Sequence, residues 1–201
     1  REYEEVIVDG SLSIAEAAAK NAVRRMIFIS STKVNGEFTQ DEVFKTDSIP
    51  SPKTSYGKSK LQAELGLFQI SRKKDLPLTV IRPPIVYGPG NSGNIYSMIK
   101  FLDWLPVGFL PLGGLKNKRS LIFIENLASA ISRCVDDFTS ESHVFFVRDP
   151  LMPSTTTLCS IILANLNKNV HLSSCNRDII QKILTFFLPK HANRIFGSLE
   201  I

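Results

Sequence analysis

The sequence predicts an α/β protein in which a parallel sheet with flanking helices is joined to a smaller mixed region. Two observations carry this prediction. Segments with helix-like and strand-like patterns alternate along residues 2–81, which is the order of parallel strands joined by crossover helices. The two strand-like segments, residues 26–30 and 78–81, are short and mostly apolar, as expected of strands that are covered on both faces.

Each element of the first half has its own sequence signal. Residues 2–22 are rich in alanine, the residue with the highest helix propensity. Residues 56–73 place Leu61, Leu65 and Phe68 on one stripe, as in an amphipathic helix. The strand at 78–81 is predicted to end at a Pro-Pro pair, because proline cannot continue a ladder of hydrogen bonds.

The second half changes character after the turn at residues 88–90. We expect a smaller region there, with short elements interleaved with the last strands of the sheet. The predicted elements are a helix at 94–105, a loop at 106–118, a strand at 120–123, a helix at 125–135, a strand at 143–147, and helices at 156–166 and 178–187.

Composition and charge argue against several classes of protein. The net charge of +5 comes from scattered lysines and arginines, whereas a nucleic-acid surface concentrates them on one face with aromatic residues. No apolar run approaches the roughly 18–20 residues that span a bilayer. Three widely spaced cysteines predict free thiols in a reducing compartment, and the histidines lack ligand spacing, so no metal site is expected. We therefore predict a cytoplasmic protein with neither nucleic-acid nor membrane partners.

Three residues, Ser31, Tyr56 and Lys60, suggest the chemistry. Four positions on a helix bring Tyr56 and Lys60 onto one face, with Cβ atoms about 5–6 Å apart. A nearby ammonium favours the phenolate and lowers a phenol pKa that is about 10 when unperturbed. With Ser31 at the carboxyl end of a strand, the three groups could move the proton of a hydroxyl while its carbon gains or loses hydride. Because Tyr-x-x-x-Lys is a weak signal by itself, the alternative is a purely structural tyrosine.

Four stretches match one known family in their residues, order and spacing. They are residues 28–36, 56–60, 81–90 and 117–128, which begin Phe-Ile-Ser-Ser, Tyr-Gly-Lys-Ser, Ile-Arg-Pro-Pro and Asn-Lys-Arg-Ser. Through them the chain resembles the extended short-chain dehydrogenases/reductases, the nucleotide-sugar epimerases and dehydratases, closest to UDP-glucose 4-epimerase-like members. The resemblance implies a Rossmann-like sheet, NAD as cofactor with NADP as the alternative, and a UDP-sugar substrate.

The resemblance also implies a role for each matching residue. Tyr56 would be the catalytic acid/base, Lys60 would lower its pKa and contact the nicotinamide ribose, and Ser31 would orient the sugar hydroxyl. Pro83 and Pro84 would form the wall beside the nicotinamide. The alternative for the two prolines is that they merely end a strand.

Two more residues are expected at the diphosphate of the substrate. Arg119 matches the family's diphosphate-binding arginine, because a guanidinium fork suits paired phosphate oxygens; the alternative is a solvated surface arginine. Asn94 would donate to the same diphosphate. Asn35 and Ile85 stand where many relatives carry Tyr and Asn, and these departures suggest altered substrate contacts.

A glycine-rich fingerprint is expected before the first strand of a dinucleotide-binding fold, because a glycine turn at a helix N-terminus holds the phosphates. This chain has none before residue 26. We therefore expect residues 1–90 to be the C-terminal half of a Rossmann-type NAD-binding domain, truncated at its N-terminus. Residues 91–201 would be the substrate-binding region, truncated at its C-terminus. Alone, such a fragment would bind its cofactor poorly and be inactive.

The predicted function is an NAD-dependent nucleotide-sugar 4-epimerase that oxidises C4 of a UDP-hexose or UDP-N-acetylhexosamine transiently. Dehydratases of the family place Asp-Glu after the serine, where this chain has Thr32 and Lys33, so dehydration is disfavoured. Two alternatives stay open: an NAD(P)H-dependent UDP-4-keto-6-deoxysugar reductase, and a non-catalytic truncated remnant. The resemblance also implies a homodimer formed through the helix that carries Tyr56.

Overall fold

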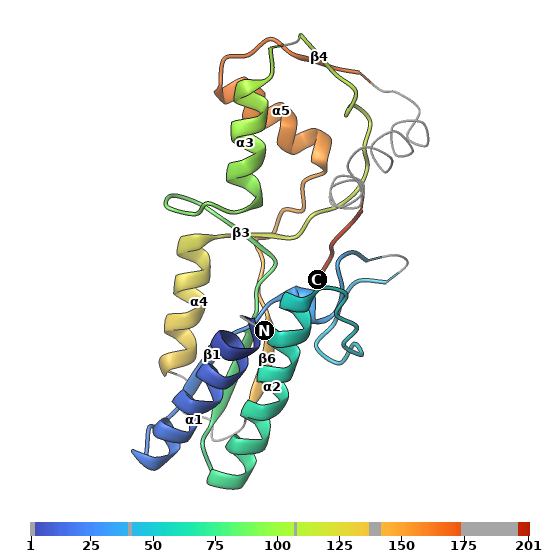
Figure 1. Cartoon of the computed structure of the whole chain (residues 1–201). Helices are drawn as coiled ribbons and strands as arrows, with labels where there is room; N and C mark the ends of the chain where they lie inside the picture. The colour runs from blue at the N-terminus through green and yellow to red at the C-terminus, as the bar shows by residue number, and fades with distance from the viewer. Residues whose placement is uncertain (1–2, 40–41, 107, 137–141, 174–196) are drawn as a thin grey trace.

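The computed structural model describes residues 3–39, 42–106, 108–136, 142–173 and 197–201 (Figure 1). A π-helical stretch, Glu4–Asp9, leads into the first α-helix, and a 3₁₀-helix, Thr32–Val34, follows the first strand. The other elements are, in chain order, α1 (Gly10–Lys20), β1 (Met26–Ile29), α2 (Ser55–Lys74), β2 (Leu78–Arg82), β3 (Ile85–Tyr87), α3 (Asn94–Trp104), β4 (Phe109–Leu110), β5 (Leu121–Phe123), α4 (Ile124–Asp136), β6 (His143–Phe146), α5 (Thr155–Asn165) and β7 (His171–Leu172).

A three-stranded parallel sheet, with strand order β1-β2-β6, forms the centre of the lower part of Figure 1. Met26 pairs with Leu78, and Thr79 pairs with His143. Every residue of β2 is buried, which agrees with the mostly apolar sequence predicted to form a strand covered on both faces. The α/β class and the parallel pairing of the first two predicted strands are therefore confirmed.

The two faces of this sheet are covered by different helices. On one face, Phe28 of β1 shares a core with residues of α1 and α2, among them Ala15 and Leu67. On the other face, Ile81 of β2 packs with Leu127 of α4. Successive strand residues point to opposite faces, so residues of β1 in the same alternation as Phe28 lie toward α2.

The smaller part of the fold lies beyond β3 and is drawn in the upper half of Figure 1. Its core joins Leu102 of α3 to Cys159 and Leu163 of α5. Two short parallel pairs, β3 with β5 and β4 with β7, connect its segments. The sheet strand β6 lies between α4 and α5 in the sequence, so the two parts are interleaved along the chain.

The predicted helices and strands correspond to α1 to α5, β1, β2, β5 and β6, but the first predicted helix, at 2–22, is π-helical over Glu4–Asp9 and becomes α-helical only at Gly10. Leu65, predicted on the apolar stripe of α2, is 56% exposed, so that part of the prediction is wrong. The predicted helix at 178–187 lies outside the described residues. Three strands of two or three residues, β3, β4 and β7, are absent from the sequence prediction. Among the described residues, no helix is both long enough and apolar enough to cross a membrane.

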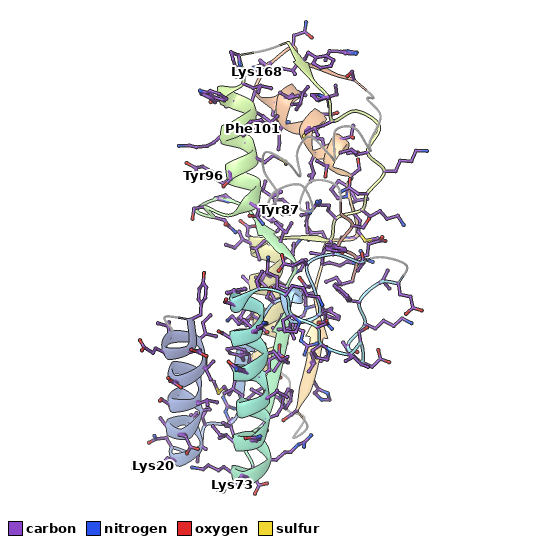
Figure 2. The ribbon with its side chains drawn as sticks, turned by 45° about the vertical axis from the view of Figure 1, so that its right-hand side comes forward. Lys20, Lys73, Tyr87, Tyr96, Phe101 and Lys168 are labelled. Atoms are coloured by element: carbon purple, nitrogen blue, oxygen red, sulfur yellow. The ribbon has the colours of Figure 1, made fainter. Side chains whose placement is uncertain are left out.

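The helix α2 has a defined start and a defined end. Thr54 is its N-cap, and the Thr54 hydroxyl accepts a hydrogen bond of 3.2 Å from the amide of Gly57. Asp75 ends the helix in the left-handed conformation, with φ of 51°. Figure 2 shows Lys20 and Lys73 together at one end of α1 and α2. The first turn of α2, which carries Tyr56, therefore lies at the opposite end, toward the junction with the smaller part.

Candidate active site

Ser31 lies two residues after the end of β1, where the chain leaves the sheet. Its hydroxyl accepts a hydrogen bond of 3.2 Å from the Lys33 amide and so caps the 3₁₀-helix Thr32–Val34. The Thr32 amide donates to the carbonyl of Pro83, at 3.1 Å. Residues 31–35, called the serine segment below, are thus held against the chain that follows the neighbouring strand, β2. Ser31 lies at the carboxyl end of the sheet, as predicted.

Tyr56 lies in the first turn of α2 and is half-buried. Its ring meets the ring of Tyr3 edge to face, with centroids 5.9 Å apart and an interplanar angle of 73°. Burial is the largest influence on its phenol and raises the pKa above its usual value. A side-chain hydrogen bond with Ser31 lowers the pKa, and the charge of Tyr3 raises it. The Ser31 side chain is thus near enough to the Tyr56 phenol to influence its protonation.

Lys60 lies one helical turn after Tyr56, with its Nζ 6.0 Å from the centre of the tyrosine ring. The ammonium donates a hydrogen bond of 2.8 Å to the carbonyl of Ile29, the last residue of β1. It also lies 4.6 Å from the centre of the Phe28 ring. Burial lowers the pKa of Lys60, and the opposite charge of Glu64 raises it.

In this structure the pKa of Tyr56 is raised, chiefly by burial, so the lowered pKa expected from Lys60 is not seen here. The physical reason is that the Lys60 ammonium bonds the Ile29 carbonyl, while the phenol is removed from water and lies against Tyr3. Tyr56 and Lys60 do lie on a common face of α2, because the Lys60 Nζ is 6.0 Å from the centre of the Tyr56 ring. The positions of Tyr56 and Lys60 therefore agree with the sequence prediction, whereas the direction of the Tyr56 pKa shift does not.

Arg119 is buried, with 9% of its surface exposed, so the alternative of a solvated surface arginine is wrong. Its backbone pairs with Leu199 in an isolated bridge, and its amide donates to the Pro153 carbonyl at 3.1 Å. Within the described part of the chain, its Nη2 has no hydrogen-bond partner. Burial lowers the pKa of this guanidinium to about 10. A buried cation with an unused donor is a fitting place for an anion.

The other predicted site residues fall in two places. Pro83 and Pro84 are buried between β2 and β3, and Pro83 receives the hydrogen bond from Thr32. Asn94 is the first residue of α3 and is exposed. No hydrogen bond joins Asn94 to Arg119 within the described ranges.

Sequence reasoning missed Tyr3, whose ring packs on that of Tyr56. Nothing in the sequence marks this contact, because it depends on how the π-helical stretch Glu4–Asp9 leads into α1 beside α2. Sequence reasoning also missed Glu64, which faces Lys60 from the next turn of α2. Its spacing of four residues after Lys60 was an available signal.

The fold and these contacts define an α/β protein with a serine, a tyrosine and a lysine at the carboxyl end of a parallel strand. The sequence model of the NAD dependent epimerase/dehydratase family matches residues 1–147, and the chain belongs to this family. It is 38% identical over 169 residues to the UDP-glucose 4-epimerase of Vibrio cholerae, an alignment that covers 83% of this chain and 51% of that protein.

A second relative has a different substrate in its name. The N-acetyl-alpha-D-glucosaminyl-diphospho-ditrans,octacis-undecaprenol 4-epimerase of Escherichia coli O157:H7 is 30% identical over 172 residues, covering 84% of this chain and 50% of that protein. The chain therefore spans about half the length of these two curated relatives.

Solved structures share the fold. UDP-glucose 4-epimerase of Thermotoga maritima, solved with UDP-glucose, superposes with a TM-score of 0.72 at 19% identity, covering 98% of this chain and 61% of that one. The Thermus thermophilus UDP-glucose 4-epimerase complex with NAD has a TM-score of 0.68 at 22% identity, covering 85% and 57%. The expected Rossmann-like class is thus confirmed.

Proposed function

We propose that the complete gene product is an NAD-dependent nucleotide-sugar 4-epimerase that acts on a UDP-hexose or a UDP-N-acetylhexosamine. The observation that carries this proposal is the meeting of Ser31, Tyr56 and Lys60 at the carboxyl end of β1. In open parallel sheets, ligands bind outside the carboxyl ends of the strands. A phenol there, hydrogen-bonded to a serine, can exchange a proton with a sugar hydroxyl.

Arg119 supports a substrate that carries a diphosphate. Its Nη2 is buried and has no partner in the described part of the chain, and a guanidinium can bind two phosphate oxygens at once. The named substrates of the two curated relatives, a UDP-sugar and a polyprenyl diphosphate sugar, share a diphosphate at the anomeric carbon. Asn94, exposed at the start of α3, is proposed as a second donor to this group.

The residues present fit the nicotinamide end of NAD. The Lys60 ammonium uses one hydrogen for the Ile29 carbonyl, and no other hydrogen bond of this group occurs within the described ranges, so two donors are left for ribose hydroxyls. Tyr56 would contact the same ribose, and Pro83 and Pro84 would line the ring. When bound, NAD supplies the acceptor for the hydrogen on C4 of the sugar, with NADP as the alternative.

The chain's own residues would handle the proton. Tyr56, as phenolate, accepts the proton of the C4 hydroxyl, and as phenol it returns a proton to the resulting carbonyl oxygen. Ser31 hydrogen-bonds the same oxygen and, through its bond with Tyr56, favours the phenolate. Lys60 fixes the first turns of α2 against the end of β1 and so holds the phenol at the strand end.

The proposal is tested by incubating the complete gene product with UDP-glucose or UDP-N-acetylglucosamine and a catalytic amount of NAD. We expect interconversion of the 4-epimers without net formation of NADH. Tyr56→Phe should lower kcat by about 10²–10⁴-fold, the range of general acid–base catalysis, with KM nearly unchanged. Tyr96→Phe, at an exposed residue of α3, is the matched control and should keep full activity.

Two other results would replace this proposal. Stoichiometric consumption of NADPH or NADH with a UDP-4-keto-6-deoxysugar would identify a reductase instead. No binding of NAD or of UDP-sugar by isothermal titration of the complete gene product would identify a non-catalytic remnant.

We also propose that the complete protein forms a homodimer through α2 and the preceding helix. Ile14 of α1 and Leu65 of α2 expose 63% and 56% of their surface to solvent, and burying these apolar side chains between two copies would be favourable. Light scattering should give twice the monomer mass, and Leu65→Glu should shift it toward the monomer. A monomeric wild-type protein would contradict this assembly.

A further inference from the structure

A buried ion pair joins α2 to the carboxyl end of β2. The Arg82 guanidinium donates two hydrogen bonds to the Glu64 carboxylate, from Nε at 3.0 Å and from Nη2 at 2.5 Å. The two side chains expose only 6% and 2% of their surface. A fork that binds both carboxylate oxygens fixes distance and orientation together. This pair therefore fixes the position of α2 relative to the carboxyl end of β2.

Asn35 extends the pair into the segment that follows Ser31. Arg82 donates from Nη1 to the Asn35 amide oxygen at 3.1 Å, and the Asn35 amide nitrogen donates to the Ser48 carbonyl at 3.3 Å. Asn35 is 3% exposed. Both ends of its amide thus bind other parts of the chain, so the expectation that Asn35 marks an altered substrate contact is not supported by the structure.

Each residue of this network lies close in sequence to a candidate residue of the active site. Glu64 lies one turn after Lys60 on α2, Asn35 closes the 3₁₀-helix that begins after Ser31, and Arg82 precedes Pro83 at the end of β2. Arg82, on β2, bonds both Glu64 on α2 and Asn35 after the 3₁₀-helix, and so links the three segments. We propose that the Glu64–Arg82–Asn35 network positions the Tyr56 phenol relative to the Ser31 hydroxyl, with Asn35 as a positioning residue.

The proposal rests on the function proposed above and deepens it. None of the three network residues is open to solvent, so they act through Tyr56 and Ser31 and do not touch substrate. Removal of one partner from a buried network leaves a charged donor without an acceptor. Without Asn35, the Arg82 Nη1 would lose its acceptor, and the serine segment would lose its direct bond to this network.

The decisive variants differ at Asn35 alone. Asn35→Leu keeps the size of the side chain and removes both hydrogen bonds, whereas Asn35→Asp keeps an acceptor for Arg82 and loses the donor to Ser48. Glu16→Gln is the matched control, because it disrupts an exposed ion pair with Lys74 that also links α1 to α2, at the far end of the helix. Glu64→Gln is the second variant, for use if Asn35→Leu does not fold.

The first readout is turnover by the complete gene product. Asn35→Leu should lower kcat by about 10–100-fold, as small misplacements of catalytic groups do, with KM within about twofold of wild type. Asn35→Asp should restore kcat to within about threefold, and Glu64→Gln should lower it. Unchanged kcat in folded Asn35→Leu, with only a lower Tm, would show a merely structural role and overturn the proposal. So would a rise in KM alone.

The second readout needs no turnover, so it separates failure of this proposal from failure of the proposed function. Tyrosine signals in a ¹³C-tyrosine NMR titration report the Tyr56 phenol, which is faced by Ser31 and Tyr3, with Lys60 beside it. The hydrogen bond of Ser31 lowers the pKa of Tyr56, so its loss in Asn35→Leu should raise that pKa further. Asn35→Asp and Glu16→Gln should match wild type. An unchanged titration in Asn35→Leu would overturn the positioning role.

Discussion

The Lys60 ammonium donates a hydrogen bond of 2.8 Å to the carbonyl of Ile29, the last residue of β1. This bond joins the helix that carries Tyr56 to the strand that leads to Ser31. It also uses a free carbonyl at the end of a strand, which would otherwise need water. Lys60 therefore has a structural task in addition to any contact with a cofactor, and both depend on its charge.

The first prediction concerns this lysine. Lys60→Met should lower kcat/KM for the UDP-hexose by about 10²–10⁴-fold, because the bond to Ile29 and the donors for the ribose are lost together. Lys58→Met, on the exposed side of the same helix, is the control and should stay near wild type. The epimerisation assay measures both. Equal activity of the two variants would remove Lys60 from the site.

The second prediction concerns Tyr3, whose charge raises the pKa of Tyr56. Tyr3→Phe keeps the edge-to-face packing and removes the second hydroxyl, so the pKa of Tyr56 should fall toward its ordinary value of about 10. A ¹³C-tyrosine NMR titration measures this shift. Tyr96→Phe should leave the Tyr56 signal unmoved, and a Tyr56 pKa that is the same in Tyr3→Phe would contradict the assignment.

The sign of this effect on stability follows from the raised pKa. A phenol that holds its proton more tightly in the folded protein stabilises the fold fully below about pH 10. That contribution is lost as the pH rises through the raised pKa of Tyr56. Denaturant unfolding of Tyr3→Phe above pH 10 should therefore show a smaller loss of stability than wild type.

The parts of the fold predicted from sequence are those with local signals. The strands β1 and β2 are short runs of apolar residues, and α2 has both an apolar stripe and a capping threonine, Thr54. The strands β4 and β7 were missed because each has two residues and their pairing joins segments far apart in the sequence. Their existence depends on the packing of α3 against α5, a contact between distant segments that no local pattern in the sequence indicates.

The candidate site divides in the same way. The common face of Tyr56 and Lys60 follows from helical spacing, and the place of Ser31 follows from the end of a strand. The raised pKa of Tyr56 depends on burial and on Tyr3, which belongs to a distant segment. The bond from Lys60 to Ile29 likewise depends on how α2 docks on the sheet, so spacing rules alone gave the wrong direction for the pKa.

The third prediction sets stability against binding at Arg119. Burial lowers the pKa of this guanidinium to about 10, so below that pH its charge costs the folded protein free energy. Arg119→Met should raise the free energy of unfolding at pH 7 by about 1–3 kcal/mol. It should also raise KM for the UDP-sugar by about 10- to 100-fold, the value of a hydrogen bond to a charged group.

Denaturant unfolding and the epimerisation assay measure the two effects of Arg119→Met separately. Lys118→Met is the control, because Lys118 is the exposed neighbour, and its ion pair with Glu200, at 3.4 Å, should contribute little. If Arg119→Met lowers stability and leaves KM unchanged, Arg119 is a structural residue and not a ligand for the diphosphate.

The fourth prediction concerns Gly57, next to Tyr56 in the first turn of α2. A Cβ at Gly57 would lie 2.6 Å from the Lys33 carbonyl oxygen and 3.1 Å from Cβ of Pro52. The Lys33 oxygen is backbone of the serine segment, so Gly57→Ala must push that segment away from α2. We expect a loss of about 1–3 kcal/mol in the free energy of unfolding and a fall in kcat, because Ser31 moves away from Tyr56.

Gly66→Ala in the same helix is the matched control for Gly57→Ala. Its Cβ would meet Leu12 Cδ2 at 2.6 Å, the end of a flexible side chain that can move aside. Alanine also gains up to about 1 kcal/mol of helix propensity over glycine, so this variant should be near wild type in stability and activity. Thermal unfolding and the epimerisation assay compare the two. Because both variants add one methyl group to α2, a similar loss in each would mean that the close approach of Lys33 to Gly57 has no special role in holding Ser31 beside Tyr56.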